Sequence, residues 1–138
     1  MKIVLDSSVT LAWVYDDEQT AATQALLDRV VQYGAVAPSL WRFEIANVLA
    51  MAVRRKRIAP DFREEALRDL ALLDIAIDPG CDGQAWTTTI RLADLYALTA
   101  YDAAYLELAQ RLRLSLATLD SALAKAAQAA GVEVLALG

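Results

Sequence analysis

Four carboxylates, those of Asp6, Glu44, Asp102 and Asp120, lie where the surrounding sequence does not explain an acidic side chain. The chain contains no His, and its only Cys is Cys81. These two facts exclude a Ser-His-Asp triad, a His-ligated zinc or haem, a disulfide framework and a Cys-rich metal site. Chemistry at neutral pH is therefore left to carboxylates, Lys, Arg and hydroxyl groups. Clustered carboxylates without His favour a hard cation such as Mg2+ or Mn2+.

Asp6 and Asp120 each follow a short apolar run. Residues 2–5 lead directly into Asp6, and residues 114–117 precede Asp120 by two positions. Either acid could instead be a helix N-cap. If the runs are parallel strands, both carboxylates lie on the same rim of the sheet.

Glu44 lies in a segment, residues 40–49, that is apolar nearly all round. Burying an unpaired carboxylate there would be costly, so Glu44 needs a partner. Asn47 at i+3 can share its helix face, whereas Arg42 at i−2 cannot. A salt bridge to a residue that the sequence does not identify is the alternative.

Asp102 ends the segment 99–102, which resembles a capping box with Asp in place of Glu. A side chain directed inward is the competing interpretation, because the positions that share its helix face are apolar. Glu107 and Arg111 are expected to form an outward i, i+4 pair on the same helix. The face-sharing neighbours of Asp102 at i+3, i+4 and i+7 are Tyr105, Leu106 and Ala109.

A divalent cation would resolve the repulsion among the four inward carboxylates. At separations of about 5 Å each pair would repel by roughly 3 kcal/mol at an effective dielectric near 20. Bound Mg2+ or Mn2+ lowers the pKa of a coordinated water and neutralises charge on a phosphate, which points to phosphodiester hydrolysis. Other acids are expected to be solvated at helix starts, on outer helix faces or beside a strand: Asp16, Asp17, Glu18, Asp61, Glu64, Glu65, Asp69, Asp74, Asp78 and Asp82.

Short apolar runs that alternate with longer amphipathic segments must position these acids. The pattern predicts one α/β domain over residues 1–138, a three-layer sandwich with a parallel sheet covered on both faces. Ligands of such sheets gather beyond the carboxyl ends of the strands. The predicted strands are residues 2–5, 35–37, 75–77, 114–117 and 133–137. The predicted helices are residues 18–31, 39–56, a segment from Pro60 with Phe62, Ala66, Leu70 and Leu73 inward, 82–95, 101–112 and 121–130.

Charge and hydropathy narrow the possible partners. A net charge of -5 argues against a general nucleic-acid coat protein. The basic run formed by Arg54, Arg55, Lys56 and Arg57 is either a solvated helix end or a contact to an RNA backbone. No apolar segment approaches the roughly 20 residues of a membrane span, and residues 1–6 are too quickly acidic for a secretory signal. We expect a cytoplasmic protein with no membrane partner.

Four motifs in this order resemble the PIN-domain ribonucleases, specifically toxins of the VapC type from bacterial or archaeal toxin–antitoxin pairs. They are IVLDSSV at residues 3–9, WRFEIAN at 41–47, LTAYDAAY at 98–105 and LATLD at 116–120. The resemblance covers the whole chain and implies a five-stranded parallel sheet. It also implies Mg2+- or Mn2+-dependent endonucleolytic cleavage of structured RNA, which would inhibit translation. The family's acidic and hydroxyl positions match Asp6, Glu44, Asp102, Asp120, Ser8 and Thr118, the last two as water-orienting or ligand-supporting groups.

The resemblance further implies a homodimer and a cognate VapB-type antitoxin that occludes the site. Large apolar side chains are favoured interface anchors, although each could equally belong to the core. RNA-backbone contact also becomes a stronger hypothesis for the basic run at 54–57. The candidate anchors are Trp13, Trp41, Trp86, Val9, Leu11 and Val14.

Two kinds of alternative function stay open. A haloacid-dehalogenase-type phosphatase requires Asp-x-Asp after the first strand, but Ser8 occupies the position of the second Asp. A receiver domain would need an acidic pair after the first strand, which this sequence lacks. Nucleotide binding is disfavoured because no Gly-x-Gly-x-x-Gly or Walker-type loop occurs. The stronger alternative is a catalytically silent PIN-like module that binds RNA or a protein. Metal affinity would separate it from an enzyme.

Overall fold

The computed structural model describes residues 1–135 and contains a five-stranded sheet in the order β3-β2-β1-β4-β5. Every strand pair is parallel. The strands are β1 (Ile3–Leu5), β2 (Ala35–Ala37), β3 (Ile75–Ile77), β4 (Leu116–Ala117) and β5 (Val134–Leu135). The predicted α/β fold is confirmed. Residues 136 and 137 of the last predicted strand lie outside the described residues.

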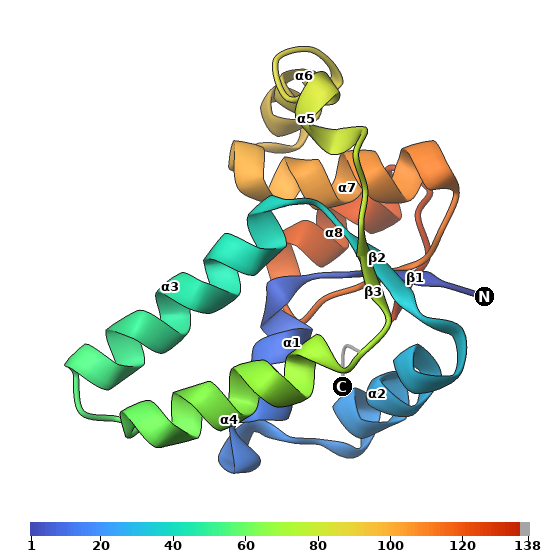
Figure 1. The fold of residues 1–138 in the computed structure, drawn as a ribbon. Coiled ribbons are helices and arrows are strands. Elements are labelled where there is room, and N and C mark those ends of the chain that lie inside the picture. The colour runs from blue at the N-terminus through green and yellow to red at the C-terminus, as the bar shows by residue number, and fades with distance from the viewer. Residues whose placement is uncertain (136–138) are drawn as a thin grey trace.

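Helices cover both faces of this sheet (Figure 1). From β1 the chain crosses the sheet in one direction to β2 and β3, and right-handed crossovers place α1 to α4 on one face. It then crosses in the opposite direction to β4 and β5, which places α7 and α8 on the other face. The helical elements are α1 (Ser7–Val14), η1 (Asp16–Glu18), α2 (Ala21–Tyr33), α3 (Leu40–Arg54), α4 (Pro60–Ala71), α5 (Cys81–Gln84), α6 (Thr88–Tyr96), α7 (Ala100–Leu112) and α8 (Ser121–Ala129).

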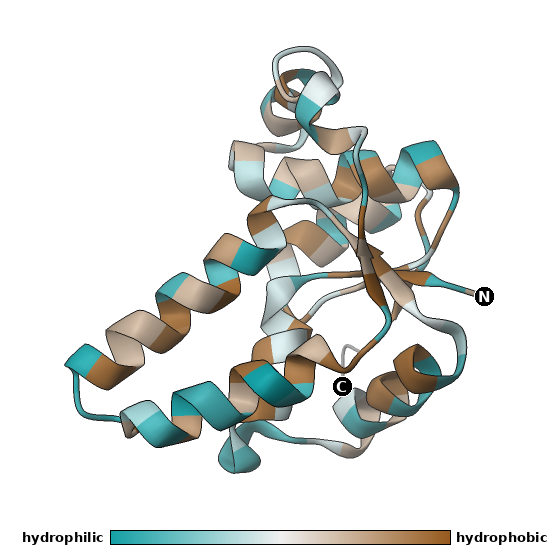
Figure 2. Cartoon of the chain, viewed as in Figure 1, coloured by the Kyte–Doolittle hydropathy of each residue, from teal (hydrophilic) through white to brown (hydrophobic). Residues whose placement is uncertain are grey.

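The core is centred on β1, whose three residues are fully buried. Hydrophobic residues gather at the strands in the middle of the molecule, whereas α4 is largely hydrophilic (Figure 2). Together α3 and α4 extend beyond the sheet as an arm (Figure 1). Within residues 1–135, no helix combines the length and apolarity needed to cross a membrane.

Three sequence-based expectations about helices need correction. The helix α1 was not predicted, because it is apolar nearly all round: Val9, Thr10, Ala12 and Trp13 are buried on one side, and Leu11 and Val14 are half-buried on the other, so no amphipathic period shows in the sequence. The predicted helix 82–95 is two helices, broken at Thr87, whose φ and ψ of -121° and -93° are not helical. In α4 no residue is fully buried, and Phe62, predicted inward, is 40% exposed.

Candidate active site

The site lies where the sheet reverses its winding. Strand β1 pairs with β2 on one side and with β4 on the other, so the crossover direction changes between β1 and β4. Asp6 follows β1 directly, and Thr118 and Asp120 follow β4. The carboxyl ends of these neighbouring parallel strands therefore bring both acids to one rim, at the position where α/β sheets usually bind ligands.

Asp6 is held by hydroxyl groups rather than by a cation. Its carboxylate is nearly buried, at 4% exposure. Ser8 and Thr118 each donate a hydrogen bond of 2.7 Å to Asp6 Oδ2. Asp6 occupies the N-cap position of α1, but its side chain makes no capping hydrogen bond. Burial raises the pKa of Asp6, and the hydroxyl hydrogen bonds oppose that rise.

The same hydroxyl groups join the turns that follow β1 and β4. Ser8 Oγ accepts a hydrogen bond of 3.0 Å from the Leu119 amide, and Thr118 Oγ1 accepts one of 3.0 Å from the Asp120 amide. Asp120 Oδ1 in turn accepts from the Leu123 amide at 2.9 Å. Asp120 is therefore the N-cap of α8 through one of its two oxygens.

Glu44 reaches the site from the first turns of α3. Tyr105, fully buried on α7, donates a hydrogen bond of 2.5 Å from its hydroxyl to Glu44 Oε1. The expectation that Asn47 would be the partner is wrong, since Asn47 is exposed; no salt bridge to Glu44 occurs within residues 1–135 either. Burial raises the pKa of Glu44, the Tyr105 hydrogen bond lowers it, and the charge of Asp6 raises it.

Asp102 completes the group from the first turn of α7. Its backbone amide donates to Thr99 Oγ1 at 3.1 Å, so Thr99 caps the helix. Burial raises the pKa of Asp102 to about 6, and the charges of the other three acids add to the rise. Asp102 lies one helical turn before Tyr105, which contacts Glu44, and so joins Glu44, Asp6 and Asp120 at this end of the sheet.

The donor set suits a hard cation that is shared with water and substrate. In the described part of the chain, none of the ion pairs involves the four acids. Over the same residues, no three His, Cys, Asp or Glu side chains are assembled closely enough to enclose a metal ion. Mg2+ usually takes one or two carboxylates and completes its octahedron with waters and phosphate oxygens. The oxygen-only donors, uncompensated by Lys or Arg, fit that mode of binding.

The basic run is remote from these acids. Arg54 ends α3, and residues 55–57 form the exposed turn towards α4. The rise of an α-helix puts Arg54 about 15 Å along the axis from Glu44. Arg57 is engaged locally, with its guanidinium 4.2 Å from the ring centroid of Tyr15 and 3.6 Å from Glu18.

Three of the six predicted interface anchors are core residues, and Leu11 and Val14 are partly buried against the core. Trp13 and Trp41 are 9% and 7% exposed, and Val9 is fully buried. Trp86 differs, because it is 89% exposed. An apolar groove of about 380 Å³ with an acidic rim lies between α1, α2 and α4. Its lining includes Trp13, Val14, Leu27, Phe62, Leu70, Leu73, Asp16, Glu65 and Asp69.

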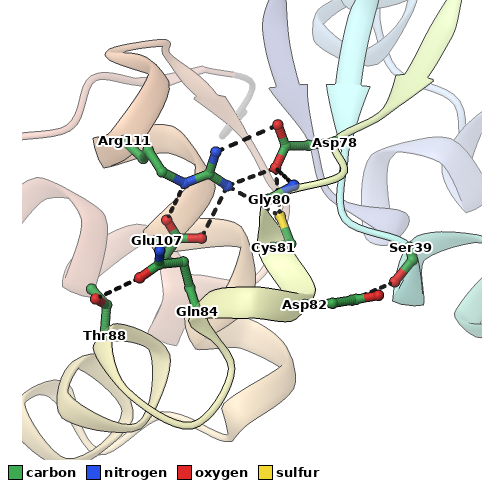
Figure 3. A network of polar contacts seen from close by, with 9 residues as sticks. All are labelled: Ser39, Asp78, Gly80, Cys81, Asp82, Gln84, Thr88, Glu107 and Arg111. Atoms are coloured by element: carbon green, nitrogen blue, oxygen red, sulfur yellow. Dashed lines mark hydrogen bonds and ion pairs between the residues drawn. The ribbon is translucent and has the colours of Figure 1, made fainter.

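A second polar network, centred on Arg111, lies at the other end of α7 (Figure 3). Arg111 contacts Asp78 at 2.6 Å and Glu107 at 2.7 Å. The predicted i, i+4 pair is confirmed, but Glu107 is buried rather than outward, at 2% exposure. Asp78, expected to be solvated, is instead paired, and the Arg111 hydrogen bond lowers its pKa.

The loop after β3 is shaped around this guanidinium. A Cβ on Gly80 would lie 2.8 Å from Arg111 Nη1, so a larger residue there would displace the guanidinium. Burial and the neighbouring Asp78 raise the pKa of the Cys81 thiol to about 12, which leaves it unreactive. Asp82 on α5 accepts a hydrogen bond of 2.9 Å from Ser39 at the start of α3. The network therefore connects the helices that carry Asp102 and Glu44.

Comparison with known proteins finds relatives along almost the whole chain. The family model described as PIN domain matches residues 3–129. Ribonuclease VapC3 from Pyrobaculum aerophilum is 27% identical over 125 residues, which cover 91% of this chain and 94% of that protein.

Solved structures agree on the fold. PAE2754 from Pyrobaculum aerophilum aligns with a TM-score of 0.64 at 21% identity, over 97% of this chain and 89% of that one. FitAcB from Neisseria gonorrhoeae aligns with a TM-score of 0.68 at 17% identity, over 96% of each chain. At these identities the two structures support the fold alone.

Proposed function

The chain belongs to the PIN-domain family, and from that premise we propose that it is a Mg2+- or Mn2+-dependent endoribonuclease. The observation that carries the proposal is that Asp6, Glu44, Asp102 and Asp120 come to the same end of the sheet and that none of them forms an ion pair within residues 1–135. A relative of matching length is named a ribonuclease, which supports RNA as the substrate.

Each part of the site has a distinct task in this proposal. Asp6, Glu44, Asp102 and Asp120 hold the divalent ion and exchange their mutual repulsion for attraction to it. When bound, the ion polarises the scissile phosphate and lowers the pKa of a water. Ser8 and Thr118 fix the rotamer of Asp6 through its Oδ2 oxygen. The N-cap hydrogen bond to the Leu123 amide fixes Asp120 in the same way.

The biological setting follows the VapC-type toxins that the chain resembles. We propose that the protein acts in the cytoplasm on structured RNA, inhibits translation and is neutralised by a cognate VapB-type antitoxin. Homodimer formation belongs to the same proposal. The exposed Arg54, Arg55 and Lys56 would contact the RNA backbone, and Arg57 would do so only by leaving Tyr15 and Glu18.

The test is cleavage of total cellular RNA by purified, antitoxin-free protein in Mg2+ or Mn2+ and in EDTA. The proposal predicts discrete fragments that require the metal and are absent with Asp102→Asn. Folded wild-type protein that gives no metal-dependent fragments would contradict the proposal. That result would favour a catalytically silent module that binds RNA or a protein.

A further inference from the structure

Tyr105 is a core side chain that ends at the acidic site. It is fully buried, yet its hydroxyl crosses from α7 to Glu44 Oε1 on α3. Tyr105 lies three residues after Asp102, so both project from the same side of α7. One helix thus supplies an acid of the site and a hydrogen-bond donor to a second acid on another helix.

The contact repeats a pattern found at the other acids. Asp6 is held through Oδ2 by two hydroxyls, and Asp120 through Oδ1 by a backbone amide. Glu44 is held through Oε1 by Tyr105. A carboxylate fixed through one oxygen presents its second oxygen to a ligand in a defined direction, which is how supporting hydrogen bonds tune metal sites.

We propose that Tyr105 is a positioning residue that orients the Glu44 carboxylate for the divalent cation. The inference rests on the proposed function, because it requires that Glu44 serve a cation. Charge-assisted hydrogen bonds of this kind are about twice as strong as neutral ones, so the contact restrains a side chain on a different helix. The position of α7 is itself secured by the ion pair of Arg111 with Asp78, which joins this helix to the loop after β3 (Figure 3).

A structural role and a positioning role for the hydroxyl differ in one measurable respect. A hydroxyl needed only for packing would change the stability of the metal-free protein and leave its affinity for metal alone. A hydroxyl that positions Glu44 would change the affinity for metal, and only while Glu44 is present. Tyr105→Phe removes the oxygen and keeps the buried ring.

Mn2+ binding, measured by titration calorimetry, provides the first test. We expect the Kd to rise roughly tenfold in Tyr105→Phe, in line with the effect of removing a ligand's hydrogen-bond partner. Tyr15→Phe is the matched control, because the Tyr15 hydroxyl is also buried and has no hydrogen-bond partner in the described residues. An unchanged Kd in Tyr105→Phe would overturn the inference, whereas wild-type protein that binds no Mn2+ would overturn the proposed function beneath it.

A double-mutant cycle shows whether the effect passes through Glu44. We expect Tyr105→Phe to add nothing to the loss of Mn2+ affinity caused by Glu44→Gln. An equal loss on both backgrounds would mean that Tyr105 acts by another route, and would overturn the inference.

A measurement on the wild-type chain does not depend on whether any variant folds. With tyrosines labelled by 13C, saturating Mg2+ should shift the Tyr105 ring resonance and leave that of Tyr15 in place. If other resonances in the same spectrum report Mg2+ binding while the Tyr105 ring resonance stays in place, the inference would be overturned.

Discussion

Two groups of buried or half-buried carboxylates in this chain are stabilised in opposite ways. Asp78 and Glu107 share one guanidinium, that of Arg111, and the pKa of Asp78 is lowered. Asp6 and Asp102 form no ion pair with a basic side chain among residues 1–135, and burial raises the pKa of both. Both acids of the first group contact a cation within the fold, whereas the second group keeps a repulsion that a divalent cation would relieve.

The difference indicates how buried acids can be assigned to stability or to chemistry. An ion-paired carboxylate costs the most when its partner is removed, because an uncompensated charge then remains buried. A carboxylate held only by hydroxyls and amides is oriented without being neutralised. Raised pKa values that combine burial with like charges are typical of functional sites.

The largest expected effect is on catalysis. It should be confined to the four site acids, which form no ion pair within residues 1–135. Each of Asp6→Asn, Glu44→Gln, Asp102→Asn and Asp120→Asn should lower the rate of metal-dependent RNA cleavage by roughly 100-fold or more, because each removes metal-binding charge worth several kcal/mol. Circular dichroism should report an intact fold. Wild-type rates in any two of these variants would contradict the assignment of the site.

Removing the shared guanidinium tests the paired group. Arg111→Ala should lower the free energy of unfolding by roughly 3 kcal/mol, since Glu107 would stay buried without a partner. Urea denaturation measures the change. Arg91→Ala is the control, because Arg91 is exposed and forms no ion pair within residues 1–135. Equal urea midpoints for the two variants would remove the distinction between the groups.

The two groups should also respond to pH with opposite sign in metal-free protein. Folded Asp102 has a pKa of about 6 against 3.8 for the free side chain, so its contribution to stability falls as pH rises through this window. Asp102→Asn should therefore stabilise the metal-free protein by about 1 kcal/mol at pH 7, after allowance for partial exposure, and by nothing near pH 4.

Asp78 provides the opposite case. Its folded pKa lies below 3.8, so its stabilising contribution is present at neutral pH and is lost as pH falls through the folded value. Asp78→Asn should thus destabilise at pH 7 and become neutral in acid. Thermal melts from about pH 2 to pH 7 measure both variants, because the Asp78 contribution is lost only below its free-side-chain pKa of 3.8. Parallel pH profiles for Asp102→Asn and Asp78→Asn would contradict the comparison.

The smallest expected effect concerns the basic run. Arg54→Ala and Arg55→Ala should weaken RNA binding modestly, and each should reduce the slope of log affinity against log salt by about 1. Arg91→Ala again provides a control. An unchanged slope would return the run to the interpretation of a solvated helix end.

The sequence predicted the sheet because short apolar runs bounded by turns occur at intervals that require parallel crossovers. The common rim for Asp6 and Asp120 follows from that geometry alone. The partner of Glu44 could not be predicted, since the contact with Tyr105 joins two helices far apart in sequence. Periodicity gives the face of a helix, but not the side chain that packs against it.

The orientation of Glu107 was missed for a related reason. Pairing with Arg111 at i, i+4 normally marks an exposed face, and the pairing itself is present. Residues 103–109 of α7 are all buried, however, because the helix is covered on the side away from the sheet as well. Tertiary packing of α7 therefore placed an ion pair in the interior.

The most direct test of the account compares one acid from each group by thermal unfolding with and without Mn2+. Wild type and Asp78→Asn should both gain several degrees in Tm at Mn2+ concentrations about 100-fold above Kd, whereas Asp102→Asn should gain little. Equal Mn2+-induced shifts in all three proteins, or no shift in wild type, would contradict the claim that the unpaired carboxylates form a cation site.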